Sequence, residues 1–166
     1  FISDAGSCLQ FEAYLLAGSF TARNCSFQSG SLDSGLDLLR SGTDFRGLVQ
    51  DCEFHCNIGI SVLAGDWVIE RCRFVPFQTT MFEFSMARIG GYSDDPPYGD
   101  VSIADCEFYP AGQVTAFFVE GYGEVSLTRL TIVGSAVQEK LLQVSDCQTV
   151  IISDLQLANS TYAFPA

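Results

Sequence analysis

The sequence predicts an all-β chain that winds as a solenoid of about six coils. Three observations predict it: a short recurring motif, apolar columns at fixed offsets from that motif, and a near-absence of helical patterns. The motif is a polar residue, a cysteine, a second polar residue and a phenylalanine, and it begins at Asn24, Asp51, Arg71 and Asp105. Internal repetition at intervals of roughly 20 to 35 residues is typical of a solenoid.

The motif defines three apolar columns. Weaker copies begin at Arg129 and Asp154, where leucine takes the place of cysteine. Side chains two apart on a strand point the same way, so the columns should line an interior. Cysteine exchanges with leucine, as a small buried hydrophobe does. The columns are Ala22, Val49, Ile69, Ile103, Leu127 and Ile152; Cys25, Cys52, Cys72, Cys106, Leu130 and Leu155; and Phe27, Phe54, Phe74, Phe108, Ile132 and Leu157.

A second strand is expected in each coil, between successive motifs. Apolar residues alternate there with polar ones, which is the period of a half-buried strand. The alternating pairs are Leu9/Phe11, Leu36/Leu38, Ile60/Val62, Phe82/Phe84, Phe117/Val119 and Leu142/Val144. We therefore expect two strands per coil.

The residue that precedes each cysteine or leucine carries a charge of alternating sign. After Asn24 the series is Asp51, Arg71, Asp105, Arg129 and Asp154. Stacked coils bring neighbours to about 4.8 Å, where opposite charges attract and like charges repel. Each exposed pair contributes under about 1 kcal/mol, so the ladder should specify register more than stability.

These motifs resemble the right-handed parallel β-helix of pectate-lyase-like enzymes and bacteriophage tailspikes. The resemblance covers one domain, residues 1–166, with coils from about 8 to 158 and a C-terminal tail at 159–166. It implies a fold and no single activity, because this fold serves lyases, hydrolases, epimerases, adhesins and inert virion parts. Because the chain begins at Phe1, we interpret it as a processed product or a domain of a longer protein.

The composition excludes several classes of protein. A formal charge of −12 disfavours binding to nucleic acids and to anionic membranes. A hydrophobic fraction of 48% is too high for a disordered chain. No apolar run approaches the length of a membrane helix, so we expect no membrane insertion.

Seven cysteines make an odd set, and their places in a buried column predict free thiols, with the state of Cys8 and Cys147 left open. The stretch Cys52–Cys56 with His55 resembles a metal site. However, Cys52 belongs to the buried column and no second pair of ligands follows. We expect no metal and no cofactor, and His55 alone cannot support a catalytic triad.

A carboxylate pair is the candidate catalytic site. In the expected outward row, Asp37 and Glu83 lie two coils apart, about 9.6 Å, close to the spacing in inverting glycosidases. The other interpretation, which we favour, is two solvated carboxylates on an acidic protein. The expected row is Gln10, Asp37, Ser61, Glu83, Phe118 and Gln143.

A loop rich in glycine and proline spans residues 90–100 and is the candidate binding site. Its members Tyr92, Asp94, Asp95 and Tyr98 could contact a sugar, a cation or a neighbouring protein. A tolerated insertion without a function is an equally good interpretation.

Apolar residues predicted to point outward from the first sheet form the candidate oligomer interface. A homotrimer is the simplest partner for such a stripe, and loops of the same chain are the alternative. The stripe consists of Leu39, Leu63, Met81, Phe118 and Leu141.

Together these features favour a structural or receptor-binding module of a virus or phage particle, such as a spike, a fibre or a capsid decoration. We expect it in the virion or outside the cell, with other virion proteins or a surface polysaccharide as partners. The alternatives are a polysaccharide hydrolase or lyase and, third, a cell-surface adhesin.

Overall fold

The computed structural model describes residues 2–3, 9–11, 15–29, 34–38, 41–76, 80–90, 98–110, 112–134 and 142–159. Their regular secondary structure is β-strand throughout, with no helix among them. It follows that no helix in these ranges is long and apolar enough to cross a membrane.

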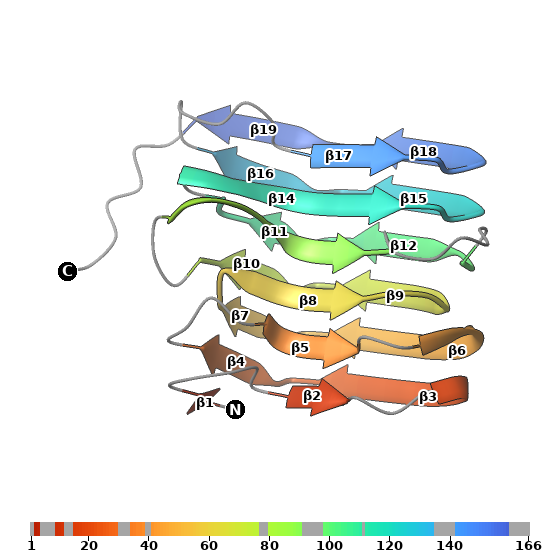
Figure 1. Ribbon diagram of the computed structural model, residues 1–166. Helices are drawn as coiled ribbons and strands as arrows, with labels where there is room; N and C mark the ends of the chain where they lie inside the picture. Colours follow the sequence, from red (N-terminus) through yellow and green to blue (C-terminus); the bar gives the residue numbers. More distant parts are fainter. Residues whose placement is uncertain are drawn as a thin grey trace.

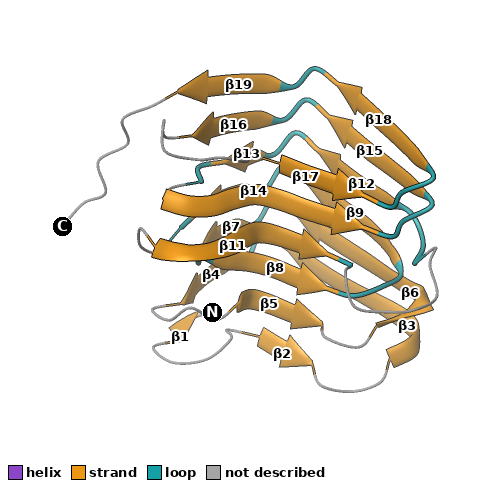
Figure 2. Cartoon of the chain, turned by 45° about the horizontal axis from the view of Figure 1, so that its top comes forward, coloured by secondary structure: helices purple, strands orange, loops and turns teal. Residues whose placement is uncertain are grey.

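The strands form three parallel sheets, which the chain visits in turn (Figures 1 and 2). The first sheet holds β2 (Leu9–Phe11), β5 (Ser34–Leu38), β8 (Ile58–Val62), β11 (Thr80–Ile89), β14 (Gly112–Glu120) and β17 (Leu142–Ser145). The second holds β3 (Leu15–Arg23), β6 (Ser41–Gln50), β9 (Asp66–Glu70), β12 (Val101–Ala104), β15 (Glu124–Thr128) and β18 (Thr149–Ser153). The third holds β1 (Ile2–Ser3), β4 (Ser26–Ser29), β7 (Glu53–His55), β10 (Arg73–Val75), β13 (Glu107–Phe108), β16 (Thr131–Gly134) and β19 (Gln156–Asn159).

Each passage through the three sheets is one coil, and the described strands make six of them, with β1 as an extra strand of the third sheet. The arrangement is compatible with a β-solenoid. The expectation of two strands per coil was wrong, because the chain turns a corner within each motif and so divides one expected strand into two.

Left-handed backbone makes that corner. The residue before each column cysteine or leucine has φ between 51° and 54°, a region that non-glycine residues seldom occupy. Its amide donates to the stacked coil, for example from Asp51 to Glu70 O at 3.0 Å and from Arg71 to Ala104 O at 3.0 Å. Asparagine and aspartate tolerate this conformation, whereas arginine has no such preference. The arginines at this position, Arg71 and Arg129, therefore need another reason to be there.

That reason is the charge ladder, which the structure confirms. Arg71 donates two hydrogen bonds to Asp51, at 2.7 and 3.0 Å, and Arg129 donates to both carboxylate oxygens of Asp105. A second ladder runs beside it, in which Arg73 lies between two glutamates, 3.5 Å from Glu53 and 3.6 Å from Glu107. These pairs are exposed, so they specify which coils stack more than they stabilise the fold.

The ladder predicts a pH-dependent stability. Hydrogen bonding from Arg71 lowers the pKa of Asp51 below its ordinary 3.8. A lowered pKa contributes stability that is present above the unfolded value and is lost as the pH falls through the folded value. Thermal unfolding should therefore show Arg71→Gln less stable than the wild type near pH 6, with the gap closing near about pH 2.

Arg46→Gln is the matched control, since the Arg46 side chain is 82% exposed and its Nε lies 3.9 Å from a carboxylate oxygen of Asp66. Its difference from the wild type should stay constant between the two pH values. A gap for Arg71→Gln that is equally wide at both would contradict the ladder as the source of the effect.

The three apolar columns are confirmed: strand pairing gives the register of two of them, and the carbonyl of each cysteine or leucine in the third, from Cys25 to Leu130, accepts a hydrogen bond from the coil above. In the column from Ala22 to Ile152, each residue is the strand-pairing partner of the next member of the column. The same holds for the column from Phe27 to Leu157. The rings of Phe27, Phe54, Phe74 and Phe108 stack with centroids 4.8, 4.8 and 4.6 Å apart and planes within 4°. All four are fully buried, so this stack is the centre of the core.

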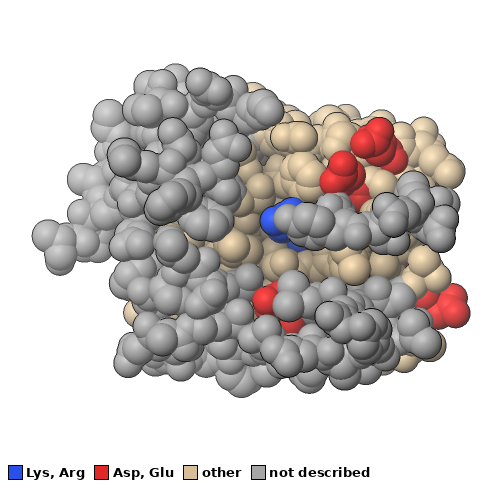
Figure 3. All heavy atoms as spheres, viewed as in Figure 1, with Lys and Arg blue, Asp and Glu red and all other residues tan. Residues whose placement is uncertain are grey.

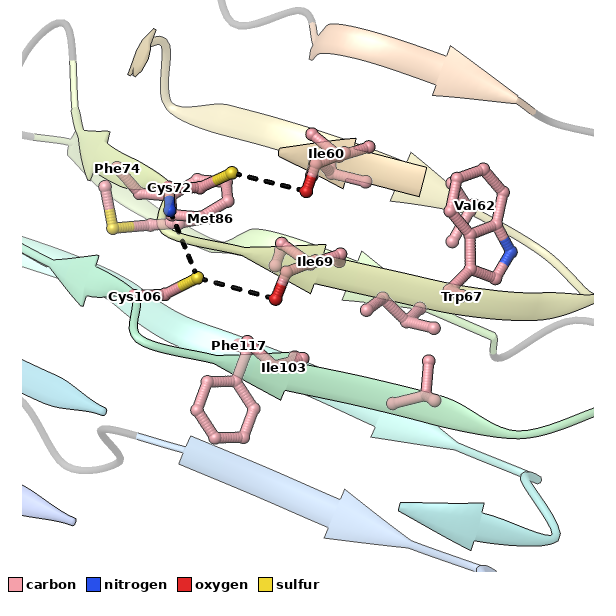
Figure 4. Close-up of a cluster of buried hydrophobic side chains, with 14 of the residues drawn as sticks. Ile60, Val62, Trp67, Ile69, Cys72, Phe74, Met86, Ile103, Cys106 and Phe117 are labelled. Carbon is pink, nitrogen blue, oxygen red and sulfur yellow. Dashed lines mark hydrogen bonds between the residues drawn. The ribbon is translucent and has the colours of Figure 1, made fainter. Parts of the chain in front are cut away.

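The column cysteines are free thiols and behave as small core residues. Cys72 and Cys106 donate to the carbonyls of Glu70 and Ala104, at 3.2 and 3.1 Å. Figure 4 shows the amide of Cys72 directed at the sulfur of Cys106. Hydrogen bonding with Cys106, together with burial, raises the pKa of Cys72 to about 12. The six described cysteines, Cys147 included, form no disulfide, and Cys8 lies outside the described residues.

The register of the fourth coil differs from the prediction. Ala87 and Ile89 pair with Ile60 and Val62, where Phe82 and Phe84 were expected. The β11 strand is ten residues long, and its C-terminal part is the part that pairs with β8. The outward row of the first sheet consequently contains Arg88 in the place predicted for Glu83.

Candidate binding surface

The outer face of the first sheet is formed by strands that bend. In β11 two consecutive residues, Met86 and Ala87, are fully buried, and the residues on either side, Ser85 and Arg88, are half-exposed. The β14 strand repeats the pattern. Because two successive side chains point inward, these strands depart from strict alternation. The outward side chains on either side of the buried pair are therefore three residues apart, and they form two outward rows on the same face.

One outward row runs through Asp37, Ser61, Arg88, Phe118 and Gln143, with each residue stacked on the next. The Arg88 guanidinium lies over the Phe118 ring, 5.9 Å from its centroid. In the other row, the hydroxyls of Ser85 and Thr115 are hydrogen-bonded at 2.7 Å. Arg88 is the only basic residue within the bounds of these six strands. Figure 3 shows basic atoms near the centre of this face, with acidic atoms around them, among the described residues.

This arrangement suits recognition. A guanidinium beside an aromatic ring can hold a carboxylate and stack on a flat apolar group, and hydroxyls alongside can bind further polar groups. Arginine and aromatic residues are also the types enriched where proteins contact each other. Because the side chains project from paired strands, their spacing is fixed before any partner binds.

The predicted carboxylate pair is not formed in this row. Asp37 is 8% exposed and is therefore a buried residue, where a solvated one was expected. Two coils above it stands Arg88, since the C-terminal part of β11 sets the register. Glu83 is part of β11 but is not one of the residues paired in this row, and its side chain is not described.

The predicted binding loop is only partly described. Tyr98 is 4% exposed and packs edge-on against Tyr122, with ring centroids 5.9 Å apart. Its amide donates to Gly121 O, and its carbonyl accepts from Gly65 N. Tyr98 is thus a core residue, whereas the sequence predicted it as a surface contact of the binding loop. The other members of the site, Tyr92, Asp94 and Asp95, lie outside the described residues.

The predicted apolar stripe is described at two of its five positions. Phe118 is half-exposed between the buried Phe117 and Val119, so it points outward as expected. Leu63 is half-buried and directly follows the end of β8. Leu39, Leu141 and the side chain of Met81 lie outside the described residues.

Sequence reasoning missed a hollow on the outer face of the second sheet. Leu48 of β6 and Val68 of β9 stack in an outward row, and with Phe20 they give the hollow an apolar floor. Its volume is about 280 Å³, and it is widely open. Apolar residues at outward positions of adjacent motifs were a signal that could have found it.

A chain of acidic groups at one corner was missed as well. The Asp66 carboxylate accepts a hydrogen bond from the amide of Asp100 at 3.0 Å, and the Asp100 carboxylate accepts one from the amide of Glu124 at 2.8 Å. These carboxylates link successive coils.

His55 lies 3.1 Å from Glu53, and the described residues contain no group of three or more side chains placed to hold a metal ion.

No family model, no curated protein and no solved structure matches this chain.

Proposed function

We propose that the chain is a right-handed parallel β-helix of the pectate-lyase-like and tailspike-like kind, and that it serves as a structural or receptor-binding module of a virus or phage particle. Its place is the virion or the extracellular space. The support for the fold is the set of three parallel sheets in register. The support for the role is one surface, the outward row of the first sheet.

The observation that carries the role is the pairing of Arg88 with Phe118 on that row. A half-exposed ring in an outward row of a sheet costs free energy where water contacts it, and a partner that covers it recovers that cost. Two further copies of the same chain are the partner that requires no other component, so we propose a homotrimer with this face at the contact. Other virion proteins or a surface polysaccharide are the further partners.

A polysaccharide hydrolase or lyase is the competing function, and an activity assay separates it from a binding module. The protein is incubated with acidic and capsular polysaccharides, and both reducing ends and unsaturated products are measured. We expect no more reducing ends or unsaturated products than in a heat-denatured control, whether or not the protein binds the polysaccharide. Release that Asp37→Asn abolishes while the fold is retained would overturn the proposal in favour of the enzyme.

A further inference from the structure

The hollow on the outer face of the second sheet lies over three adjacent strands. Its volume is about 280 Å³, and it opens widely to the outside. Every residue that lines it is described, and all of them come from β3, β6 and β9, which lie one above another in Figure 1. Because these strands are paired in register, the spacing of the lining side chains is fixed before any ligand binds.

Two aliphatic side chains form the apolar part of the hollow. Leu48 of β6 pairs with Val68 of β9, and both are half-exposed in the outward row that includes Thr21. The next members of the row are Ser102 and Ser126, so the apolar patch ends with the hollow. An apolar group of a ligand that covers this patch removes its surface from water, which favours binding.

Two side chains of opposite charge stand at the rim. Arg46 Nε lies 3.9 Å from Asp66 Oδ2, which is too long for a hydrogen bond, and the two side chains are 82% and 49% exposed. The other carboxylate oxygen, Oδ1, accepts a hydrogen bond from the amide of Asp100 at 3.0 Å, which orients the carboxylate. The rim therefore offers a donor and an acceptor side by side, next to the hydroxyls of Ser19 and Thr21.

The charges of the lining indicate a neutral ligand. Arg46 and Asp66 are the charged residues of the lining, and their formal charges cancel. The whole chain carries a formal charge of −12, which repels an acidic ligand, and a basic ligand would compete with Arg46 for the carboxylate. A neutral ligand that has a donor and an acceptor close together satisfies both rim groups and buries no uncompensated charge.

The backbone argues against an extended peptide as the occupant. The strand at the centre of the hollow, β6, is paired with β3 on one side and with β9 on the other, so it has no free edge. A peptide that adds to a sheet obtains its affinity from main-chain hydrogen bonds at such an edge. Recognition on this face depends on side chains, which suits a compact ring that carries polar groups.

We propose that the hollow binds an N-acetylated sugar of a surface polysaccharide. The acetyl methyl group packs on Leu48 and Val68, the amide N–H donates to Asp66, and the amide carbonyl accepts from Arg46. This inference rests on the proposed function for its partner, a surface polysaccharide. It adds the class of sugar and a site on a different sheet from the proposed trimer contact.

Saturation-transfer NMR on the full-length protein tests the contact with the acetyl group. The probe is chitotriose, and the matched ligand is cellotriose, which carries a hydroxyl where chitotriose carries the acetamido group. We expect chitotriose to bind with a dissociation constant of about 1 mM, as suits a small and open site. The acetyl methyl protons should receive the strongest saturation, and cellotriose should bind about tenfold more weakly.

Two variants locate the site. Val68→Ser should weaken the binding of chitotriose about tenfold, because it removes half of the apolar patch. Serine is the residue type of the next position in the row, Ser102, so the substitution suits the strand. Ser126→Val is the matched control: it is the reverse change two coils further along the same row, outside the lining, and should leave binding unchanged.

Three results would overturn the proposal: no saturation transfer to chitotriose at about 10 mM, equal binding of chitotriose and cellotriose, or equal weakening by the two variants. N-acetyl-leucinamide is measured in the same way, and tighter binding of this probe than of chitotriose would assign the hollow to a protein partner instead. Failure of the proposed function is a separate result, because the mass of the protein in solution and the assay for polysaccharide cleavage do not involve the hollow.

Discussion

Replacing Phe74 with alanine is expected to lower the free energy of unfolding by about 3–5 kcal/mol. Phe74 lies in the middle of the aromatic stack, 4.8 Å from Phe54 and 4.6 Å from Phe108, and none of its surface is exposed. The two neighbouring rings belong to strands that are hydrogen-bonded on either side of β10, so they cannot close the gap. The cavity should therefore remain and add to the loss of buried apolar area.

Phe74→Leu is the matched control for this substitution. The same column contains Ile132 and Leu157, so an aliphatic side chain suits this environment. We expect Phe74→Leu to lose clearly less stability than Phe74→Ala, and urea unfolding of both variants measures the difference. Equal losses would show that the site relaxes around a cavity, in contradiction to a rigid stack.

The second large effect is expected at Gly47. Its row runs inward through Trp67 and Val101, and the indole of Trp67 fills the space that a side chain at Gly47 would need. A Cβ at this position would lie 2.0 Å from Cζ3 of Trp67. The indole cannot swing aside freely, because its Nε1 donates to Ala64 O at 3.0 Å and its ring packs on Phe45. Gly47→Ala should therefore cost about 3 kcal/mol of stability through overpacking.

A double-mutant cycle isolates the cause. Trp67→Val places in this row the same residue type that stands at Val101 and Val125. The substitution removes the indole from the space beside Gly47. Gly47→Ala should then cost little, which gives a coupling energy of about 2–3 kcal/mol. Denaturant unfolding of the four proteins yields the cycle. A cost that is the same in both backgrounds would mean that the backbone of Gly47, and not the indole, resists the substitution.

The core columns could be predicted from the sequence because a strand repeats every two residues and the motif recurs in every coil. The charge alternation from Asp51 to Asp154 also pointed to the correct stacking. A polar turn residue before each cysteine or leucine could be recognised, but its left-handed conformation could not, since nothing local in a sequence such as Glu70-Arg71-Cys72 indicates that Arg71 adopts a positive φ. The ion pair with Asp51, in a different coil, is what selects arginine there.

The register of the fourth coil could not be predicted for a related reason. Phe82 and Phe84 alternate as well as Ala87 and Ile89 do, so the local pattern cannot decide which of the two pairs with Ile60 and Val62. Contacts distant in the sequence decide it, including the hydrogen bond from Gly90 N to Val62 O at 2.8 Å.

The register of the fourth coil also decides which residues lie in the row of the predicted carboxylate pair. It removed Glu83 from the row of Asp37 and brought Arg88 beside Phe118. Tyr98 shows the same limit, because its sequence neighbours are typical of a loop while its ring packs on Tyr122 from the next coil.

The mass of the protein in solution, measured by light scattering after size exclusion at two concentrations, tests the proposed contact face most directly. We expect a trimer, near three times 18.1 kDa, at both concentrations. Phe118→Glu should reduce it to a monomer by placing a charge in the contact, while Arg46→Glu, an exposed change on the second sheet, should leave it trimeric. A wild-type monomer at both concentrations, or a Phe118→Glu trimer, would contradict the account.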